Sequence, residues 1–352
     1  SDGRSSIRLA FGDELLRSLF AAGDEAVIEV DHDDPMVKAD LSAETLQSLL
    51  RSRPNGVIRL EVNGAGYEAP LRLWSSVRVG ATATVAISRP SAAETARLNE
   101  ELASQGYAML AEPMDFALYM DGTEWSGADG VYTRRTLSLV TAVDSDRSTV
   151  AWMDRDGRLR FVPSVFEKGK AIFYSPHNSL YTAIRSDRTF TDAARHWARA
   201  DIELLASKLV VGGTSPDKFE PDRTVTRAEF AAMLVRALGL AGKLGGDVYS
   251  DVRPEADWYG GAVGAASDAG LIEGYEDGTF RPNASVTREQ AVVMLSRAIR
   301  FAGVQLPGAD ANALDRFSDQ ASTAGWAKDA AGQLLAAGII EGVDGASFAP
   351  KQ

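Results

Sequence analysis

The stretch Thr226-Arg227-Ala228-Glu229 decides the fold of the C-terminal half, and it returns as Thr287-Arg288-Glu289-Gln290. A threonine followed three residues later by Glu or Gln is a capping box, in which two side chains satisfy free amides at the start of a helix. Apolar residues follow each copy at i, i+3, i+4, i+7 and i+8, which is the pattern of an amphipathic helix with one buried face. The sequence therefore predicts two similar helices that start at these threonines.

Both helix starts belong to a longer internal repeat. Each unit has, in the same order, an aromatic residue two positions before an Asp, a Trp at the start of a shorter helix, a Gly, and a Phe-x-Pro loop. The three sets are Phe190-Thr191-Asp192, Trp197, Gly212 and Phe219-Glu220-Pro221; Tyr249-Ser250-Asp251, Trp258, Gly274 and Phe280-Arg281-Pro282; and Phe317-Ser318-Asp319, Trp326, Gly342 and Phe348-Ala349-Pro350. The two helices of one unit cannot bury both of their apolar faces alone, so the units are expected to pack on one another.

These residues resemble the S-layer homology domain, a module that fixes bacterial surface proteins to the cell wall. The resemblance covers about residues 190–352, and the three repeats are expected at 187–243, 244–306 and 307–352. It implies an all-α pseudo-threefold helical bundle whose grooves bind secondary cell-wall polysaccharide attached to peptidoglycan, a polymer that often carries an anionic pyruvate ketal. It also implies an extracellular location, at the cell wall or in the S-layer of a Gram-positive rod.

The chain departs from that family at three places. The first repeat has Val211-Gly212-Gly213 where the family has Gly-Tyr, and the second has Gln290 where Glu is commoner. The third repeat reaches Gln352 before a second helix of its own begins, so this repeat is incomplete in the sequence.

Composition narrows the classes of partner. The chain has 352 residues, no Cys and a net charge of −12, which argues against nucleic acid and against anionic membrane surfaces as partners. No apolar run reaches the length needed to cross a bilayer, so membrane insertion is not expected. No signal peptide precedes Ser1, so we expect a mature fragment of a secreted protein.

The N-terminal half is predicted to form two modules. Residues 1–111 mix helices with strands and predict an α+β module, whereas residues 112–186 carry short strands separated by turn signals and predict a β-rich, sandwich-like module. The helices are expected at 13–20, 42–50 and 91–105; the strands at 25–30, 57–62, 66–71, 82–88, 116–120, 132–139, 149–154, 158–162, 171–175 and 180–185; and the turns at Asn63-Gly64, Asp121-Gly122, Asp129-Gly130, Asp156-Gly157 and Lys168-Gly169. The half resembles modules that precede S-layer homology repeats in surface proteins, which implies a location and no chemistry.

The candidate carbohydrate-binding residues lie in the repeats. Arg227 and Arg288 follow the capping threonines, where a helix N-terminus offers free amides and partial positive charge, and a guanidinium there suits a bidentate pair with a carboxylate such as pyruvate. The wider set of candidates includes the capping residues Thr226, Glu229, Thr287 and Gln290. It also includes Trp197, Trp258 and Trp326, which are equally expected to anchor the core or to form the wall of a groove. Gly212 and Gly274 complete the set, because they are expected to end helices and to leave room for a ligand. The repeat Asp residues are expected to cap loop amides.

Alternatives to a wall anchor are a surface enzyme, a self-processing protein and a subunit of a self-assembling layer or appendage. His177-Asn178-Ser179 has the His-x-Ser order of self-cleaving β-sandwich modules, although a plain strand end explains it as well. No phosphate loop, nucleophile elbow or metal-binding His pair is visible, so no enzyme, cofactor or metal site is predicted. The acidic loop from Asp31 to Pro35 fits no calcium-loop spacing.

Overall fold

The computed structural model describes residues 5–78, 80–125, 131–154, 158–241, 249–308, 310 and 312–352. The turns expected at Asp129-Gly130 and Asp156-Gly157 lie outside these residues. The chain separates into two compact units, Ser1–Phe219 and Glu220–Gln352, which we describe one at a time.

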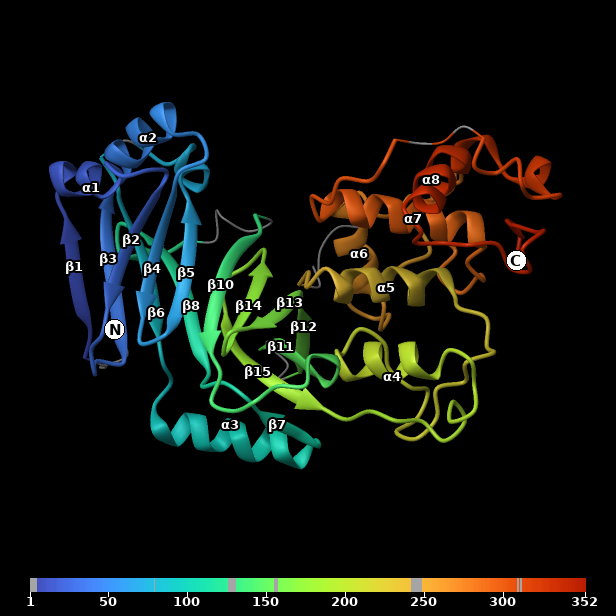
Figure 1. The fold of residues 1–352 in the computed structure, drawn as a ribbon, viewed down its shortest axis with the longest axis horizontal. Helices are drawn as coiled ribbons and strands as arrows, with labels where there is room; N and C mark the ends of the chain where they lie inside the picture. The colour runs from blue at the N-terminus through green and yellow to red at the C-terminus, as the bar shows by residue number, and fades with distance from the viewer. Residues whose placement is uncertain are drawn as a thin grey trace. The chain divides into compact units, whose positions relative to one another are not determined.

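Strands of the first unit form two sheets in the described residues (Figure 1). One sheet has the order β1 (Ile7–Phe11), β3 (Met36–Ser42), β6 (Thr82–Ser88), β8 (Met114–Met120), β15 (Leu180–Ser186), β11 (Ser148–Met153) and β12 (Leu159–Val162), with β7 (Tyr107–Met109) on β15 and β9 (Thr123–Glu124) on β8. The other has the order β13 (Ser164–Glu167), β14 (Lys170–Ser175), β10 (Thr133–Ser138), β5 (Ala65–Pro70), β4 (Val57–Val62) and β2 (Glu25–Val30). Aromatic contacts such as Tyr67–Phe116 and Phe116–Phe173 join the two sheets, so the unit is a sandwich with one shared core.

The boundary expected between residues 111 and 112 needs correction. Strand β6 pairs along its length with β8, and β5 pairs with β10, so each sheet takes strands from both sides of that boundary. The expected boundary rested on the change from mixed helix and strand signals to regularly spaced strand signals along the sequence. Such local signals do not show which strands, far apart in the chain, pair with each other. The sandwich expected for 112–186 therefore extends back to β1.

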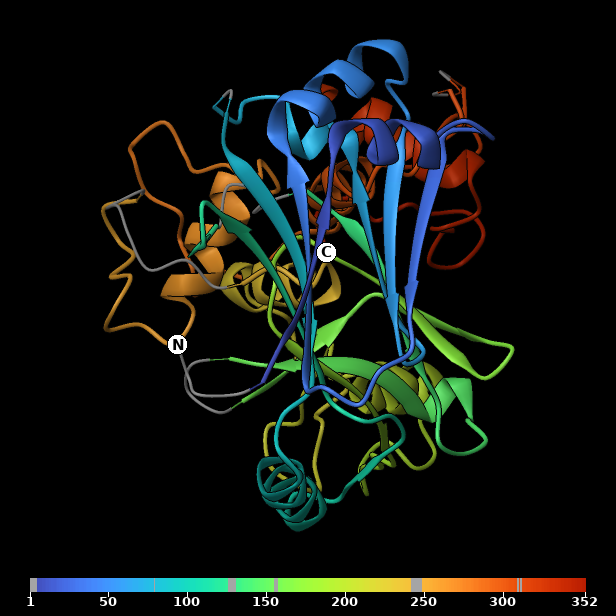
Figure 2. The same ribbon diagram turned by 90° about the vertical axis from the view of Figure 1, so that its left-hand side faces the viewer.

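Helices cover the ends of this sandwich. Helices α1 (Asp13–Leu19) and α2 (Ala43–Ser52) lie over one end of the strands, and α3 (Ala92–Ser104) lies at the other end (Figures 1 and 2). All three were predicted, and Ser91 with Glu94 forms the expected capping box of α3. Five strands of the described residues were not predicted, namely β1, β3, β7, β9 and β13, and of these β1 and β3 pair with each other in parallel.

Three of the predicted turns are hairpins with both central residues in the left-handed region. The φ angles are 47° and 84° at Asn63-Gly64, 50° and 80° at Asp121-Gly122, and 49° and 76° at Lys168-Gly169. Type I′ turns require this conformation, which Asn, Asp and Gly adopt at low cost, so the turns at Asn63-Gly64 and Asp121-Gly122 follow from local chemistry. At Lys168-Gly169 only the glycine has this preference.

The first unit also contains the first helix of the repeats, α4 (Arg199–Ser207). Glu203 of α4 is buried and pairs with Arg147 of the short helix η2 (Ser145–Arg147) at 3.1 Å and with Arg199 at 2.9 Å. Lys208 Nζ donates to the Ser145 carbonyl at 2.8 Å. The boundary expected at 186/187 is thus crossed by ion pairs and hydrogen bonds.

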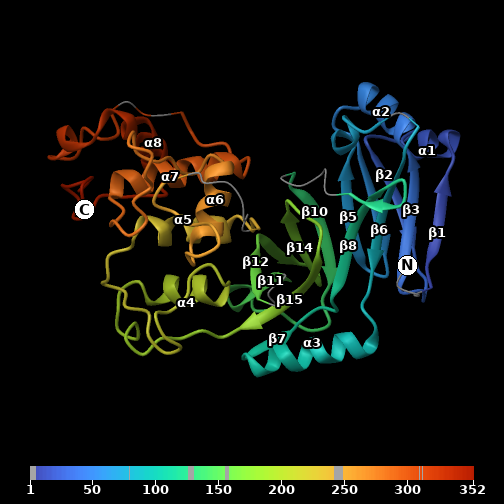
Figure 3. The same ribbon diagram turned by 180° about the vertical axis from the view of Figure 1, so that it is seen from behind.

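The second unit consists of helices α5 (Arg227–Ala237), α6 (Gly260–Asp268), α7 (Arg288–Phe301) and α8 (Gly325–Ala336), with the short η3 (Gln320–Ser322), within the described residues (Figure 3). Helix α5 packs against α6 and α7 against α8, so the second helix of one repeat pairs with the first helix of the next. The helices are as expected, and the pseudo-threefold bundle stays a prediction.

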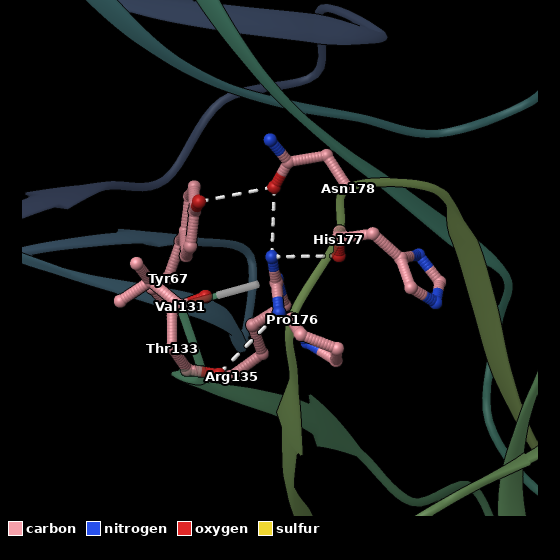
Figure 4. Close-up of a pocket in the computed structure, with 7 residues that line it drawn as sticks. All are labelled: Tyr67, Val131, Thr133, Arg135, Pro176, His177 and Asn178. Atoms are coloured by element: carbon pink, nitrogen blue, oxygen red, sulfur yellow. Dashed lines mark hydrogen bonds between the residues drawn. The ribbon is translucent and has the colours of Figure 1, made fainter. Parts of the chain in front are cut away.

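A buried arginine, Arg135, connects strand β10 to the end of β14 and to the turn that follows it (Figure 4). Its Nη1 donates to the carbonyls of Thr133 at 3.3 Å and Ser175 at 3.1 Å, and its Nη2 donates to the His177 carbonyl at 3.1 Å and to Asn178 Oδ1 at 2.7 Å. Its guanidinium carbon lies 4.6–5.7 Å from the ring centroids of Tyr67, Phe116 and Tyr181. Such contacts favour a cation that has left water.

Arg135→Met is expected to lower the free energy of unfolding by about 3 kcal/mol or more, since each buried acceptor left without a donor costs about 1–3 kcal/mol. Urea unfolding followed by tryptophan fluorescence measures this loss. The control is Arg134→Met: this neighbour on β10 pairs with Glu68 in a partly exposed position, and its loss is expected to cost less than about 1 kcal/mol. Equal losses in the two variants would contradict the role given to Arg135.

Candidate functional site

The helix starts of α5 and α7 have the predicted capping boxes. In α5 the Glu229 amide donates to Thr226 Oγ1 at 3.2 Å, and the Thr226 amide donates back to Glu229 Oε2 at 2.9 Å. In α7 the Gln290 and Thr287 pair makes the same two bonds at 3.4 and 3.3 Å. These four side chains are thus used to begin the helices.

The next amides of each helix are bonded to the following repeat. The Arg227 and Ala228 amides donate to the carbonyls of Ala284 at 2.9 Å and Pro282 at 3.0 Å. The amides of Arg288 and Glu289 donate in the same way to Gln352 at 2.6 Å and to Pro350 at 3.0 Å. The expectation that these helix N-termini offer free amides to a ligand is therefore wrong, because the Phe-x-Pro loop of the next repeat occupies them.

The two arginines extend this connection between repeats. Arg227 is 5% exposed; its Nε donates to the Phe280 carbonyl at 2.8 Å and its Nη2 to the Glu273 carbonyl at 3.1 Å. Arg288 Nη2 donates to the carbonyl of Glu341, which occupies the place of Glu273 in the third repeat. We call the contact of α5 with the loop 273–284 seam 1 and the contact of α7 with the loop 341–352 seam 2.

Both guanidiniums keep a positive charge that no carboxylate balances directly. Burial lowers the pKa of Arg227 and of Arg288 below the ordinary arginine value, yet arginine stays protonated in proteins at neutral pH. In the part of the chain that the structure describes, neither forms an ion pair; carbonyl dipoles and the rings of Phe280 and Phe348, at 4.6 and 5.4 Å, face them instead. Carbonyl oxygens and aromatic rings therefore take the place of a carboxylate partner for these two guanidiniums.

The loops that receive the arginines are shaped by the repeat aspartates. Asp251 accepts from the amides of Phe280 at 2.7 Å and Arg281 at 2.8 Å, and Asp319 accepts from the corresponding amides of the third repeat at 2.8 and 2.7 Å. Backbone donors lower the pKa of Asp319. Arg281 has a φ of 57°, which is strained for a residue with a side chain, and the paired bonds hold it there. The expected loop-capping role of these aspartates is confirmed.

The glycine assignments need correction. A Cβ on Gly274 would lie 2.4 Å from the Tyr249 ring, and one on Gly213 would lie 2.6 Å from the Phe190 ring, whereas one on Gly212 would meet nothing within 4 Å. The equivalent of Gly274 in the first repeat is thus Gly213, one residue beyond the expected Gly212. Helix ends are formed elsewhere, by left-handed residues such as Gly270 with a φ of 67°.

The three repeat tryptophans lie on the surface. Trp197, Trp258 and Trp326 are 88%, 70% and 58% exposed. The core-anchor interpretation is therefore wrong. Each ring instead presents an aromatic face at the start of a first helix, where burial of the short helix is provided by smaller residues such as Val263 and Ala331.

His177 of the candidate cleavage motif lies beside Arg135, to which its carbonyl is hydrogen bonded (Figure 4). Its Nδ1 is 3.1 Å from Tyr181 Oη, and its ring centroid is 4.4 Å from that of Trp152. The imidazole that would have to act as the base toward Ser179 is thus directed to Tyr181. Arg135 donates to the His177 carbonyl and to Asn178 Oδ1 and so fixes the turn that precedes β15. A structural role at the start of this strand therefore accounts for the motif.

The described residues include neither a membrane-spanning helix nor a metal-binding group. No described helix combines the length and the apolar content that a bilayer crossing requires. The same residues contain no group of three or more His, Asp or Glu side chains placed to hold a metal ion, the acidic loop around His32 included.

Tandem helix pairs joined by arginine seams define a repeat module, and comparison with known proteins identifies it. Residues 189–231, 248–292 and 316–352 match the S-layer homology domain, so the C-terminal region carries three such repeats. The chain is 39% identical over 184 residues to an amylopullulanase of Thermoanaerobacterium thermosulfurigenes, covering 52% of this chain and 10% of the relative.

Two further relatives have names that refer to anchoring or to a surface layer. The cellulosome-anchoring protein of Acetivibrio thermocellus is 35% identical over 118 residues, or 32% of this chain and 26% of the relative. The surface layer protein of Brevibacillus choshinensis is 35% identical over 150 residues, or 40% of this chain and 13% of the relative. The chain thus spans only a small part of the length of these relatives.

Gly213→Ala is expected to destabilise the first unit by about 1–3 kcal/mol, because the added methyl would overlap the Phe190 ring and the Lys218 carbonyl. Gly212→Ala is the matched control and is expected to change stability by less than about 0.5 kcal/mol. Thermal unfolding of both variants compares them. If Gly212→Ala lowered the stability more than Gly213→Ala does, Gly212 and not Gly213 would be the equivalent of Gly274.

Proposed function

We propose that this chain is part of a cell-surface protein that its C-terminal repeats hold noncovalently to the cell wall by binding wall polysaccharide. The observation that carries the proposal is the match of three segments to the S-layer homology domain, which anchors surface proteins to the cell wall. Relatives named for cellulosome anchoring and for the surface layer share this region. The location that follows is extracellular, at the wall, with the sandwich as a spacer or a part of the layer.

We infer that the polysaccharide carries acidic sugar units. Arg227 and Arg288 place positive charge at the two seams without an ion pair in the described residues, although the whole chain is strongly acidic. A charge-assisted bond to a guanidinium is about twice as strong as a neutral one. Two seams on one chain would also add avidity along a polymer.

The exposed tryptophans supply the second part of the proposed recognition. An aromatic face can cover the apolar side of a sugar ring, and Trp258 and Trp326 present such faces on the second unit. The capping threonines, Glu229 and Gln290 support the helix starts, so their contribution is to keep the arginines in place. The repeats themselves are anchoring modules without catalytic residues in this proposal.

A second candidate function is a subunit of a self-assembling surface layer. Relatives named Surface layer protein and Surface-layer 125 kDa protein favour it. Analytical ultracentrifugation over a range of concentrations separates the two functions, because an anchor alone stays at one mass and a layer subunit grows with concentration.

The wall-binding proposal predicts that the 352-residue chain sediments with purified Gram-positive cell walls. It further predicts that binding is lost when the walls are chemically stripped of their non-peptidoglycan polymer. The measurement is the bound fraction over a range of wall concentrations. If the chain still bound to the stripped walls, its ligand would be peptidoglycan itself, and the proposal that it binds the polymer would be wrong.

Trp258→Ala combined with Trp326→Ala is expected to weaken wall binding by about tenfold, because each aromatic contact contributes about 0.5–1.5 kcal/mol. Stability is expected to change little, since both side chains are exposed. Val304→Ala, which removes another exposed apolar side chain of the second unit, is the control and is expected to bind as the unchanged chain does. Equal binding by all three proteins would remove the tryptophans from the site.

A further inference from the structure

Helix α4 of the first repeat differs from its counterparts in the other two repeats at four positions that contact the sandwich. Counted from the repeat Trp, these positions lie six, ten, eleven and twelve residues on. The first repeat has Glu203, Ser207, Lys208 and Leu209 there, whereas the second has Gly264, Asp268, Ala269 and Gly270 and the third has Gly332, Ala336, Ala337 and Gly338. The differences thus coincide with a contact that belongs to the first repeat.

The polar members of this set are bonded to one part of the sandwich. Glu203 and Ser207 are buried, and both face Arg147, whose guanidinium nitrogens lie 3.1 Å from Glu203 Oε2 and 3.5 Å from Ser207 Oγ. Lys208 Nζ donates to the Ser148 carbonyl at 3.1 Å. The end of η2 and the start of β11 therefore bind three side chains from this end of the helix.

The fourth member, Leu209, ends α4 in a conformation that suits glycine. Its φ is 62°, and the glycines at this position in the other repeats, Gly270 and Gly338, both have a φ of 67°. A left-handed residue after the last turn of a helix is usually Gly, because a side chain there costs free energy. The Leu209 side chain packs against the sandwich cluster that contains Ala151 and Ile184. This packing offsets the strain that a glycine would avoid.

The third repeat shows what the helix face at the position of Glu203 receives elsewhere. A Cβ on Gly332 would lie 2.9 Å from the Asp310 carbonyl oxygen, so the chain segment before the third repeat lies directly on α8. In α4 the same position carries the carboxylate that pairs with Arg147. The sandwich, which precedes the first repeat in the chain, thus takes the place that the linking segment has in the third.

We propose that the sandwich is an obligatory folding partner of the first repeat. Its docking surface consists of Arg147, Ser148, Ala151 and Ile184, and it accepts a first helix with an acid six positions and an aliphatic side chain twelve positions after the Trp. Of the three repeats only the first has both. Helix α4 is ordered only while it is seated on this surface, whereas α6 and α8 pack on α5 and α7 and do not need it. The inference does not depend on the wall ligand.

Hydrogen–deuterium exchange of the full chain tests this dependence, because local opening of one helix raises the exchange rate of its own amides. Arg147→Met changes only the sandwich and leaves Glu203 with one partner in place of two, so the α4 amides are expected to exchange about tenfold faster. The amides of α8 and of β6 are expected to keep their rates, which shows that the chain still folds. Arg185→Met is the matched control, since this arginine of β15 is half exposed and pairs with Asp187; it is expected to leave α4 unchanged.

Leu209→Gly separates docking from strain. A glycine adopts a φ of 62° at low cost, so the change would slow exchange in α4 if Leu209 served only to end the helix. Docking predicts the opposite result, about threefold faster exchange, because the packing on the sandwich is lost. Leu205→Ala truncates a partly exposed leucine of the same helix and is the control, with α4 rates expected to change by less than about twofold.

Three results would overturn the inference. Equal α4 rates in the unchanged chain, Arg147→Met and Leu209→Gly would show that the first repeat does not depend on the sandwich. Slower α4 exchange in Leu209→Gly would reduce the leucine to a strained helix end. Faster exchange of α4, α6 and α8 together in Arg147→Met would show that the contact stabilises the whole chain and not this helix.

Discussion

The C-terminal unit depends on one interaction, the insertion of an arginine from one repeat into the Phe-x-Pro loop of the next. In seam 1 the loop gives Arg227 two carbonyls and a ring face, and it gives the amides of the same helix start two more carbonyls. A helix begins with amides that have no partner inside the helix. Here the neighbouring repeat supplies those partners, so neither the helix start nor the loop is complete without the other.

This dependence explains why the loops are built so similarly. The carbonyls can face the arginine only if the chain turns sharply before the proline, and the residue there adopts a left-handed conformation that costs free energy. Asp251 and Asp319 offset that cost with paired bonds to the loop amides. With the framework fixed in this way, positions such as Tyr275 and Val343 are free to differ between the two loops.

Sequence reasoning found the features that depend on neighbours in the chain and missed those that depend on distant residues. The capping boxes at Thr226 and Thr287 and the Asn63-Gly64 turn follow from local hydrogen bonding and backbone preference, and they were predicted. The partners of the Arg227 guanidinium lie about fifty positions away in the next repeat, and nothing near Arg227 indicates them. The exposure of Trp197 and the choice of Gly213 over Gly212 were missed for the same reason, since both depend on what packs against the loop.

The first repeat shows that surroundings, more than sequence, decide the role of a helix position. Leu205 stands eight residues after Trp197, as Ala266 and Leu334 stand after their tryptophans. Ala266 and Leu334 are fully buried, whereas Leu205 is 37% exposed, because α6 and α8 each pack on the second helix of the preceding repeat and α4 has no preceding repeat. Helix α4 instead carries Glu203, where the other repeats have glycines, and this carboxylate pairs with Arg147 of the sandwich. The attachment of this helix to the sandwich therefore combines a specific ion pair with the packing of Leu209 against Ala151 and Ile184.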